Sequence, residues 1–140
     1  MKIFPYANIM VGILLFIVGV ILHWIGQVVS VINWEFAKKI GIREKKTLPE
    51  FEVYERGMAF AEALIGWVYA IAAIGLIYDI SWAYPLAWFP GSILIYHSIS
   101  YWFWIGNQNK SGKSTTSSKF RIIWFLLNFI TGIFCILLAW

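Results

Sequence analysis

The sequence predicts an all-α integral membrane protein, with four transmembrane helices in an up-down bundle and both termini on the non-cytoplasmic side. Three observations support this fold class. The 140 residues are 61% hydrophobic and 13% charged, whereas soluble domains are about half apolar and about a quarter charged. The apolar residues form four runs of about 20 residues or more, the length that crosses a bilayer. The basic residues are concentrated between these runs, in two of the three connecting segments.

The four runs are expected to form a single domain over residues 1–140, with helices at about 6–33, 57–80, 83–105 and 120–140. The first run is too long for a cleavable signal peptide, and Lys2 is the only basic residue before it. The second helix is expected to begin near residue 48, before the membrane, because Thr47 and Glu50 have the spacing of a capping box. In the third run Pro90 predicts a kink, since proline removes one helical hydrogen bond.

The positions of Lys and Arg predict which side of the membrane each connecting segment faces. Residues 34–56 hold six of the eleven Lys and Arg residues and residues 107–121 hold four, whereas the turn at 80–82 holds none. Cytoplasmic loops of membrane proteins carry such an excess of positive charge. We therefore expect a multi-pass protein of the cell membrane, with loops 34–56 and 106–119 cytoplasmic and both termini outside.

Several function classes are disfavoured by composition and spacing. The net charge of +4 comes from residues that flank apolar runs, so we expect no nucleic-acid binding. Cys135 is the only cysteine, which excludes an intrachain disulfide and a cysteine-based metal site. The segment "GNQNKSGKS" has five residues between its glycines, whereas a phosphate-binding loop has four.

A layer of polar residues is predicted in the cytoplasmic half of the bundle. Counting about 1.5 Å per residue from the cytoplasmic end of each run places one polar residue of every helix at roughly 8–15 Å from that boundary: His23, Glu62, His97 and Asn128. One turn away on the same faces lie Gln27 and Tyr101. Because polar groups in hydrocarbon need partners, we expect these side chains to face a common centre.

Three- and four-residue spacing places these polar groups on stripes with small or aromatic residues. In the first helix the stripe is Phe16, Gly19, His23, Gln27 and Ser30. In the second it is Ala59, Glu62, Gly66, Tyr69 and Ala73. In the fourth it is Arg121, Trp124, Asn128, Thr131 and Cys135. Small residues beside polar ones are typical of helix–helix interfaces in membranes.

Three functions are consistent with this layer, and the sequence does not decide whether the protein is an enzyme. The first is a cytoplasm-facing pocket for a small or lipidic ligand. The candidate ligand-binding residues are His23, Gln27, Glu62, His97, Tyr101, Asn128 and Arg121. In a catalytic version, Glu62 would act as acid or base and His97 would titrate near neutral pH.

The second function is a cofactor site, and the third is an interaction or accessory subunit. His23 and His97 could bind a haem, or together with Glu62 a non-haem metal, but the sequence assigns neither cofactor. In the third reading, the polar layer only fixes the packing of the helices, with interhelical hydrogen bonds of about 0.6 kcal/mol on average. The lipid bilayer is the one partner implied in every case, and a homo-oligomer is compatible with all three.

The organisation of the chain resembles the four-helix membrane enzymes of eicosanoid and glutathione metabolism, the MAPEG superfamily. The shared features are the size, the outward termini, the charged first cytoplasmic loop and a polar site in the cytoplasmic half. The stretch "LPEFEVYERGMAFAE" at residues 48–62 is similar to the beginning of the second helix in that family, with Glu62 and, one residue out of register, Arg56 as the nearest matches. Arg121 and Tyr101 also fit the family.

The resemblance covers topology and no specific motif. The family has an arginine two turns before the glutamate and an asparagine between them, where this chain has Glu55 and Ala59. The resemblance implies a trimer that binds glutathione or a lipid between subunits.

Overall fold

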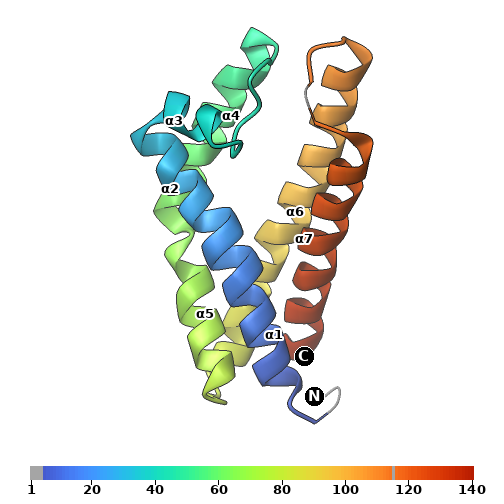
Figure 1. The fold of residues 1–140 in the computed structure, drawn as a ribbon. Coiled ribbons are helices and arrows are strands. Elements are labelled where there is room, and N and C mark those ends of the chain that lie inside the picture. The colour runs from blue at the N-terminus through green and yellow to red at the C-terminus, as the bar shows by residue number, and fades with distance from the viewer. Residues whose placement is uncertain (1–4, 115) are drawn as a thin grey trace.

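A computed structural model describes residues 5–114 and 116–140. These residues form helices and no strand (Figure 1). The elements in chain order are α1 (Ala7–Leu15), η1 (Phe16–Trp24), α2 (Ile25–Ile32), α3 (Trp34–Lys39), α4 (Pro49–Ile65), α5 (Trp67–Ile77), α6 (Ala83–Lys110) and α7 (Ser118–Ala139). The all-α prediction is confirmed for this part of the chain.

Two helical stretches of the described chain are long and apolar enough to cross a membrane: Ala7–Ile32 and Ser118–Ala139, each with a mean hydropathy of 2.5 over its most apolar part. A third span results if α4 and α5, which meet at 42°, cross as one bent helix. The 28-residue α6 is long enough but does not reach the same apolar composition. These helices are those of a membrane protein. The number of four membrane spans remains a prediction.

The first span is one continuous helix whose middle part, η1, has the wider π-helical winding. Such segments are rare and often occur at functional sites. Gly19, near the middle of η1, lets the Tyr69 ring approach closely, because a Cβ at Gly19 would lie 2.6 Å from Cδ1 of that ring. His23 and Trp24 are the last two residues of this π-helical segment.

The second predicted helix is divided at Gly66, and Trp24 explains the division. The Trp24 indole occupies the space where a Gly66 side chain would be, and its N–H donates to the Ala63 carbonyl oxygen at 2.9 Å. Helices bend where a side chain inserts beside their hydrogen-bond ladder. The helix predicted over 57–80 is therefore divided into two, since α4 ends at Ile65 and α5 at Ile77.

The beginning of α4 and the first loop also differ from the prediction. The N-cap of α4 is Leu48, with no side-chain cap, so the capping box at Thr47 is wrong. Pro49 begins the helix instead, which suits a residue with fixed φ and no N–H. Within loop 34–56 lies the short helix α3, which was not predicted and which Asn33 caps by accepting from the Phe36 N–H at 2.9 Å.

The last two helices follow the prediction more closely. α6 begins at Ala83, continues through Pro90 and extends to Lys110, five residues beyond the predicted end. Part of the predicted loop 106–119 is therefore helical. α7 begins at Ser118, with the Ser117 hydroxyl accepting from the Phe120 N–H at 3.2 Å.

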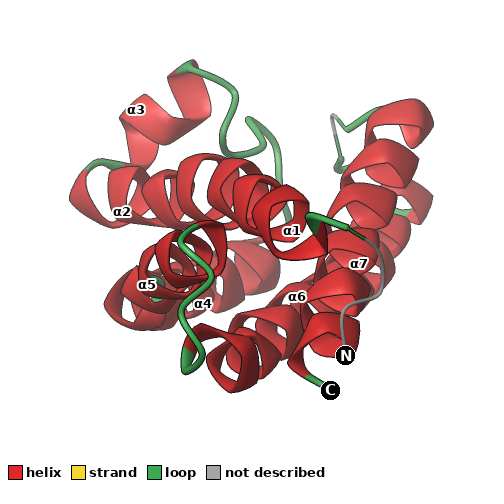
Figure 2. Ribbon diagram, turned by 90° about the horizontal axis from the view of Figure 1, so that it is seen from below, coloured by secondary structure: helices red, strands yellow, loops and turns green. Residues whose placement is uncertain are grey.

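The helices pack tightly at one end of the molecule and separate at the other. The start of α1 and the end of α7 lie at the same end, opposite α3 and the α6–α7 connection (Figure 1). Seen from below, α1 packs against α5 on one side and α7 on the other (Figure 2). The apolar core lies among α1, η1, α5, α6 and α7. Toward the loop end, the pair α2 and α4 diverges from the pair α6 and α7 (Figure 1).

Candidate functional site

A cavity of about 710 Å³ lies at the loop end, between the two diverging helix pairs. Its apolar wall is formed by Leu22, Ile42, Phe51, Ile105, Phe120 and Trp124. Residues of the loop that follows α3, among them Glu44, Lys45 and Thr47, form its mouth. At the opposite, deep end it is lined by the polar side chains of His23, Gln27 and His97. The cavity therefore connects a polar end inside the bundle with the loops.

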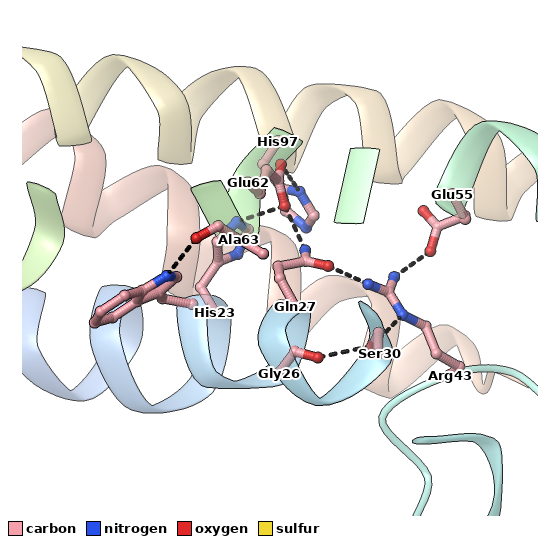
Figure 3. Close-up of polar contacts among 10 residues, drawn as sticks. His23, Gly26, Gln27, Ser30, Arg43, Glu55, Glu62, Ala63 and His97 are labelled. Atoms are coloured by element: carbon pink, nitrogen blue, oxygen red, sulfur yellow. Dashed lines mark hydrogen bonds and ion pairs between the residues drawn. The ribbon is translucent and has the colours of Figure 1, made fainter. Parts of the chain in front are cut away.

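Three ionisable side chains from three helical elements meet beside this deep end (Figure 3). Glu62, on α4, is 3% exposed. One of its carboxylate oxygens, Oε2, lies 3.0 Å from Nε2 of His23 on η1, and the other, Oε1, lies 3.2 Å from Nδ1 of His97 on α6. The two imidazole rings contact each other edge to face, with centroids 4.2 Å apart. The cluster thus consists of one carboxylate shared by two imidazoles.

A chain of hydrogen bonds links Glu62 to the loop at the mouth of the cavity (Figure 3). The Gln27 amide donates to Glu62, and the Gln27 carbonyl oxygen accepts from the guanidinium of Arg43. Arg43 also donates to Ser30 Oγ at 2.9 Å and to the carboxylate of Glu55. The guanidinium therefore fixes α2, the loop and α4 relative to one another, and through Gln27 it orients Glu62.

Some buried polar atoms next to the cluster have no hydrogen-bond partner in the described chain. Neither ring nitrogen of His23 has one, although Nε2 lies 3.0 Å from Oε2 of Glu62. The Tyr69 hydroxyl, whose ring lies 5.6 Å from the His23 ring, is also unpartnered. Buried polar groups are normally paired, so these atoms have unused capacity to bind a ligand.

The predicted stripe residues are mostly buried. The second-helix stripe, Ala59 to Ala73, is buried at all five positions, and Gly19, His23, Gln27 and Ser30 are buried in the first helix. Phe16 is exposed, so it does not belong to the buried face.

The remaining predicted site residues have different surroundings. Tyr101 lines the cavity and stacks on His97, with ring centroids 6.2 Å apart. Asn128 is fully buried, but its amide donates to the Trp124 carbonyl oxygen of its own helix at 2.8 Å, and the described chain shows no hydrogen bond from it to the cluster. Arg121 donates to the Trp102 carbonyl oxygen at 2.5 Å and lies over the Trp102 ring. The structure brings together His23, Gln27, Glu62, His97 and Tyr101, and it places Asn128 and Arg121 elsewhere.

Two residues of the site were not recognised in the sequence. Arg43 was counted only as a topology signal, although it contacts three polar partners. Trp34 is 8% exposed, and the guanidinium carbons of Arg43 and Arg56 lie 4.9 and 4.8 Å from its ring centroid. The only sequence signal was their location in the charged first loop, which does not distinguish them from neighbouring basic and aromatic residues.

No family model, curated protein or solved structure matches the chain at a significant level. The resemblance to the MAPEG superfamily therefore stays a prediction.

Proposed function

We propose that the chain is a multi-pass protein of the cell membrane that binds an amphipathic ligand in a cavity open to the cytoplasm. In this proposal the four spans are Ala7–Ile32, the bent pair α4–α5 from about residue 57 onward, α6 and α7, in up-down order. Residues 49–56 of α4 extend into the cytoplasm. The segments that hold ten of the eleven Lys and Arg residues lie at one end of the molecule, opposite the start of α1 and the end of α7 (Figure 1). The positive-inside rule assigns that end to the cytoplasm.

The observation that carries the proposed function is the cavity of about 710 Å³ whose polar deep end adjoins an apolar wall. This volume lies within the roughly 300–1,000 Å³ of small-molecule sites. Leu22 and Phe120 line the cavity and are 43% and 54% exposed, so their apolar surface is accessible to a ligand. An alkyl chain could therefore lie along the wall, while a polar group reaches His23 and His97.

The charges near the deep end favour a neutral or cationic polar group on the ligand. Glu55 and Glu62 carry two negative charges and Arg43 one positive charge, which leaves a net charge of −1 when both histidines are neutral. Arg43 is already bonded to three partners, so it does not offer a free site for an anion. An alcohol or amine can bond to an unpartnered ring nitrogen of His23, which lines the cavity, and such a group adds no negative charge to the site.

Filling the cavity tests the proposal. Gly26 lines it, and a Cβ there would meet only Ile42 Cγ2, at an ordinary 3.7 Å. Gly26→Leu should therefore occupy the cavity without a backbone clash. Gly57→Leu is the matched control, because Gly57 lies outside the cavity and a Cβ there has no neighbour within 4 Å.

Equilibrium binding of radiolabelled dodecylamine, dodecanol and dodecanoate is measured with protein in nanodiscs, after subtraction of binding to empty nanodiscs. We expect the wild type and Gly57→Leu to bind the amine and the alcohol more tightly than the carboxylate. Gly26→Leu should weaken binding at least about tenfold, since it removes the apolar contacts of the ligand. Equal binding to wild type and Gly26→Leu would show that the ligand is not in this cavity.

A further inference from the structure

We propose that His23, Glu62 and His97 form a binding site for a divalent transition-metal ion. This inference goes beyond ligand binding in the cavity and does not depend on it. It starts from the ligand set: two imidazoles and one carboxylate, whose ligand atoms all lie within 4.8 Å of one another. Two histidines with one carboxylate are a ligand set used by zinc and by non-haem ferrous sites.

The distances suit a common ion. With metal–ligand bonds of about 2.0–2.2 Å, two ligands of a tetrahedral site are about 3.4 Å apart. The Glu62 oxygens lie 3.0 and 3.2 Å from the nearest nitrogens of His23 and His97. A small side-chain rotation of Glu62 would give a single ion access to all three groups.

The state of His23 distinguishes this cluster from a simple hydrogen-bonded pair. Its side chain is fully buried, and neither ring nitrogen makes a hydrogen bond in the described chain. A buried imidazole without hydrogen bonds is unfavourable, and coordination of Nε2 would satisfy one of its nitrogens. The charges of the three side chains also suit a metal, because a metal binds neutral imidazoles and an ionised carboxylate. The positive charge of the ion would compensate the negative charge of the buried Glu62.

The surroundings of the cluster meet two further requirements of a metal site. The Gln27 amide holds Glu62 from outside the triad, and Arg43 in turn holds Gln27, as outer-shell partners orient metal ligands (Figure 3). His23 and His97 both line the cavity, which provides a path for the ion. Three protein ligands next to a cavity leave coordination positions open, an arrangement typical of catalytic rather than structural metal sites.

The test is metal binding by the full chain, purified without a histidine tag and reconstituted in nanodiscs. The protein is treated with a chelator and then incubated with Zn²⁺, with Co²⁺, or anaerobically with Fe²⁺. Bound metal is measured by inductively coupled plasma mass spectrometry after desalting, and the visible absorption of bound Co²⁺ reports its coordination. The variants are Glu62→Gln and His97→Gln, which retain side-chain volume. Ser98→Ala is the matched control, since Ser98 is buried and follows His97 in the sequence, and its hydroxyl bonds to the Ile95 carbonyl oxygen and to no metal-site residue in the described part of the chain.

We expect about one ion per chain in the wild type and in Ser98→Ala, and affinity reduced more than about tenfold in both ligand variants. Metal should also raise the melting temperature of the wild type and not that of the ligand variants, because it binds only the folded state. This second measurement separates loss of the site from loss of the fold. Less than one tenth of an ion per chain in folded wild type would overturn the proposal, as would unchanged affinity in both ligand variants. In either case the triad would be a packing contact only.

Discussion

At the end that holds the start of α1 and the end of α7, the helices touch through small residues. At the opposite end they separate around charged ones. A Cβ at Gly91 would lie 2.8 Å from the Gly132 carbonyl oxygen, and one at Gly132 would lie 2.6 Å from that of Gly91. At the loop end, the buried residues Trp34, Phe51 and Ile105 lie outside the main apolar core. The space there is occupied by the Glu62 cluster and by the cavity.

The difference shows that the two ends are held together by different interactions. In lipid, apolar side chains gain little from leaving their surroundings, so helices associate by close backbone contact and by polar bonds. The terminal end relies mainly on close contact, with one buried polar bond from the Asn8 amide to the Leu76 carbonyl oxygen at 3.0 Å, whereas the loop end relies on a network of polar bonds. A polar end with a cavity can exchange its partners for a ligand or an ion, whereas a closely packed end cannot. The loop end is therefore the part of the molecule where function is expected.

The largest effect is expected at the loop end, from Glu62→Ala. This change removes the carboxylate that contacts His23 and His97 and accepts from the Gln27 amide, and it opens a gap between three helices. Removing one member of a buried ionic cluster typically destabilises a protein by about 3–5 kcal/mol. Unfolding by SDS, followed by circular dichroism, measures the loss, and Ser98→Ala is the control. A loss below about 1 kcal/mol would mean that the loop end does not depend on this cluster for stability.

The next largest effect is expected at the terminal end, from Gly91→Ala and Gly132→Ala. Each added methyl group would meet a backbone carbonyl, so α6 and α7 must move apart. Such overpacking costs about 1–3 kcal/mol, measured by the same SDS titration. Gly57→Ala is the control, because Gly57 has open space around its Cα and lies within α4. The free energy of unfolding of Gly57→Ala should equal that of the wild type or exceed it by up to about 1 kcal/mol. Equal effects at all three glycines would contradict the close contact of α6 and α7.

Hydrophobic runs predicted the all-α fold, and depth counting predicted part of the site. The counted depth placed His23, Glu62 and His97 at one level, and the structure has them in contact. Asn128 was counted to a similar level but bonds to the Trp124 carbonyl oxygen of its own helix. Depth gives the position along a helix and not the direction in which a side chain points, so this difference could not be read from the sequence.

The features that were missed depend on contacts between distant segments. The division at Gly66 and the bend between α4 and α5 follow from the Trp24 indole, which bonds to Ala63. A period of 3.6 residues contains no information on such an insertion. Arg43 likewise lies in a loop with no periodic pattern, and only the folded chain brings Gln27, Ser30 and Glu55 around it.

An intermediate effect is expected from Arg43→Lys. Arginine holds its three partners with separate N–H groups in one plane, and a single ammonium group cannot keep all three in place. We expect a loss of about 1–2 kcal/mol and faster amide hydrogen exchange at residues 40–47. Arg56→Lys is the matched control, since the Arg56 side chain is 52% exposed and its carboxylate partner is Glu52, four residues away on the same helix. If both changes had the same small effect, the Arg43 network would not stabilise the loop end.

The smallest effect is expected from Glu52→Gln, ten residues before Glu62 on the same helix. Hydrogen bonds from Arg56 and from Lys38 lower the pKa of Glu52 below its ordinary value of 4.5. Its side chain is 27% exposed and Arg56 is 52% exposed, so water and salt screen these pairs. We expect a loss of about 0.2–1 kcal/mol at neutral pH, reduced further in high salt. Because the folded pKa is lowered, the stabilisation is fully present above pH 4.5 and is lost as pH falls through the folded pKa. The free energies of unfolding of wild type and Glu52→Gln should therefore differ at pH 7 and become equal in acid. A difference that persists below the folded pKa would show that Glu52 contributes to stability by packing and not by its charge.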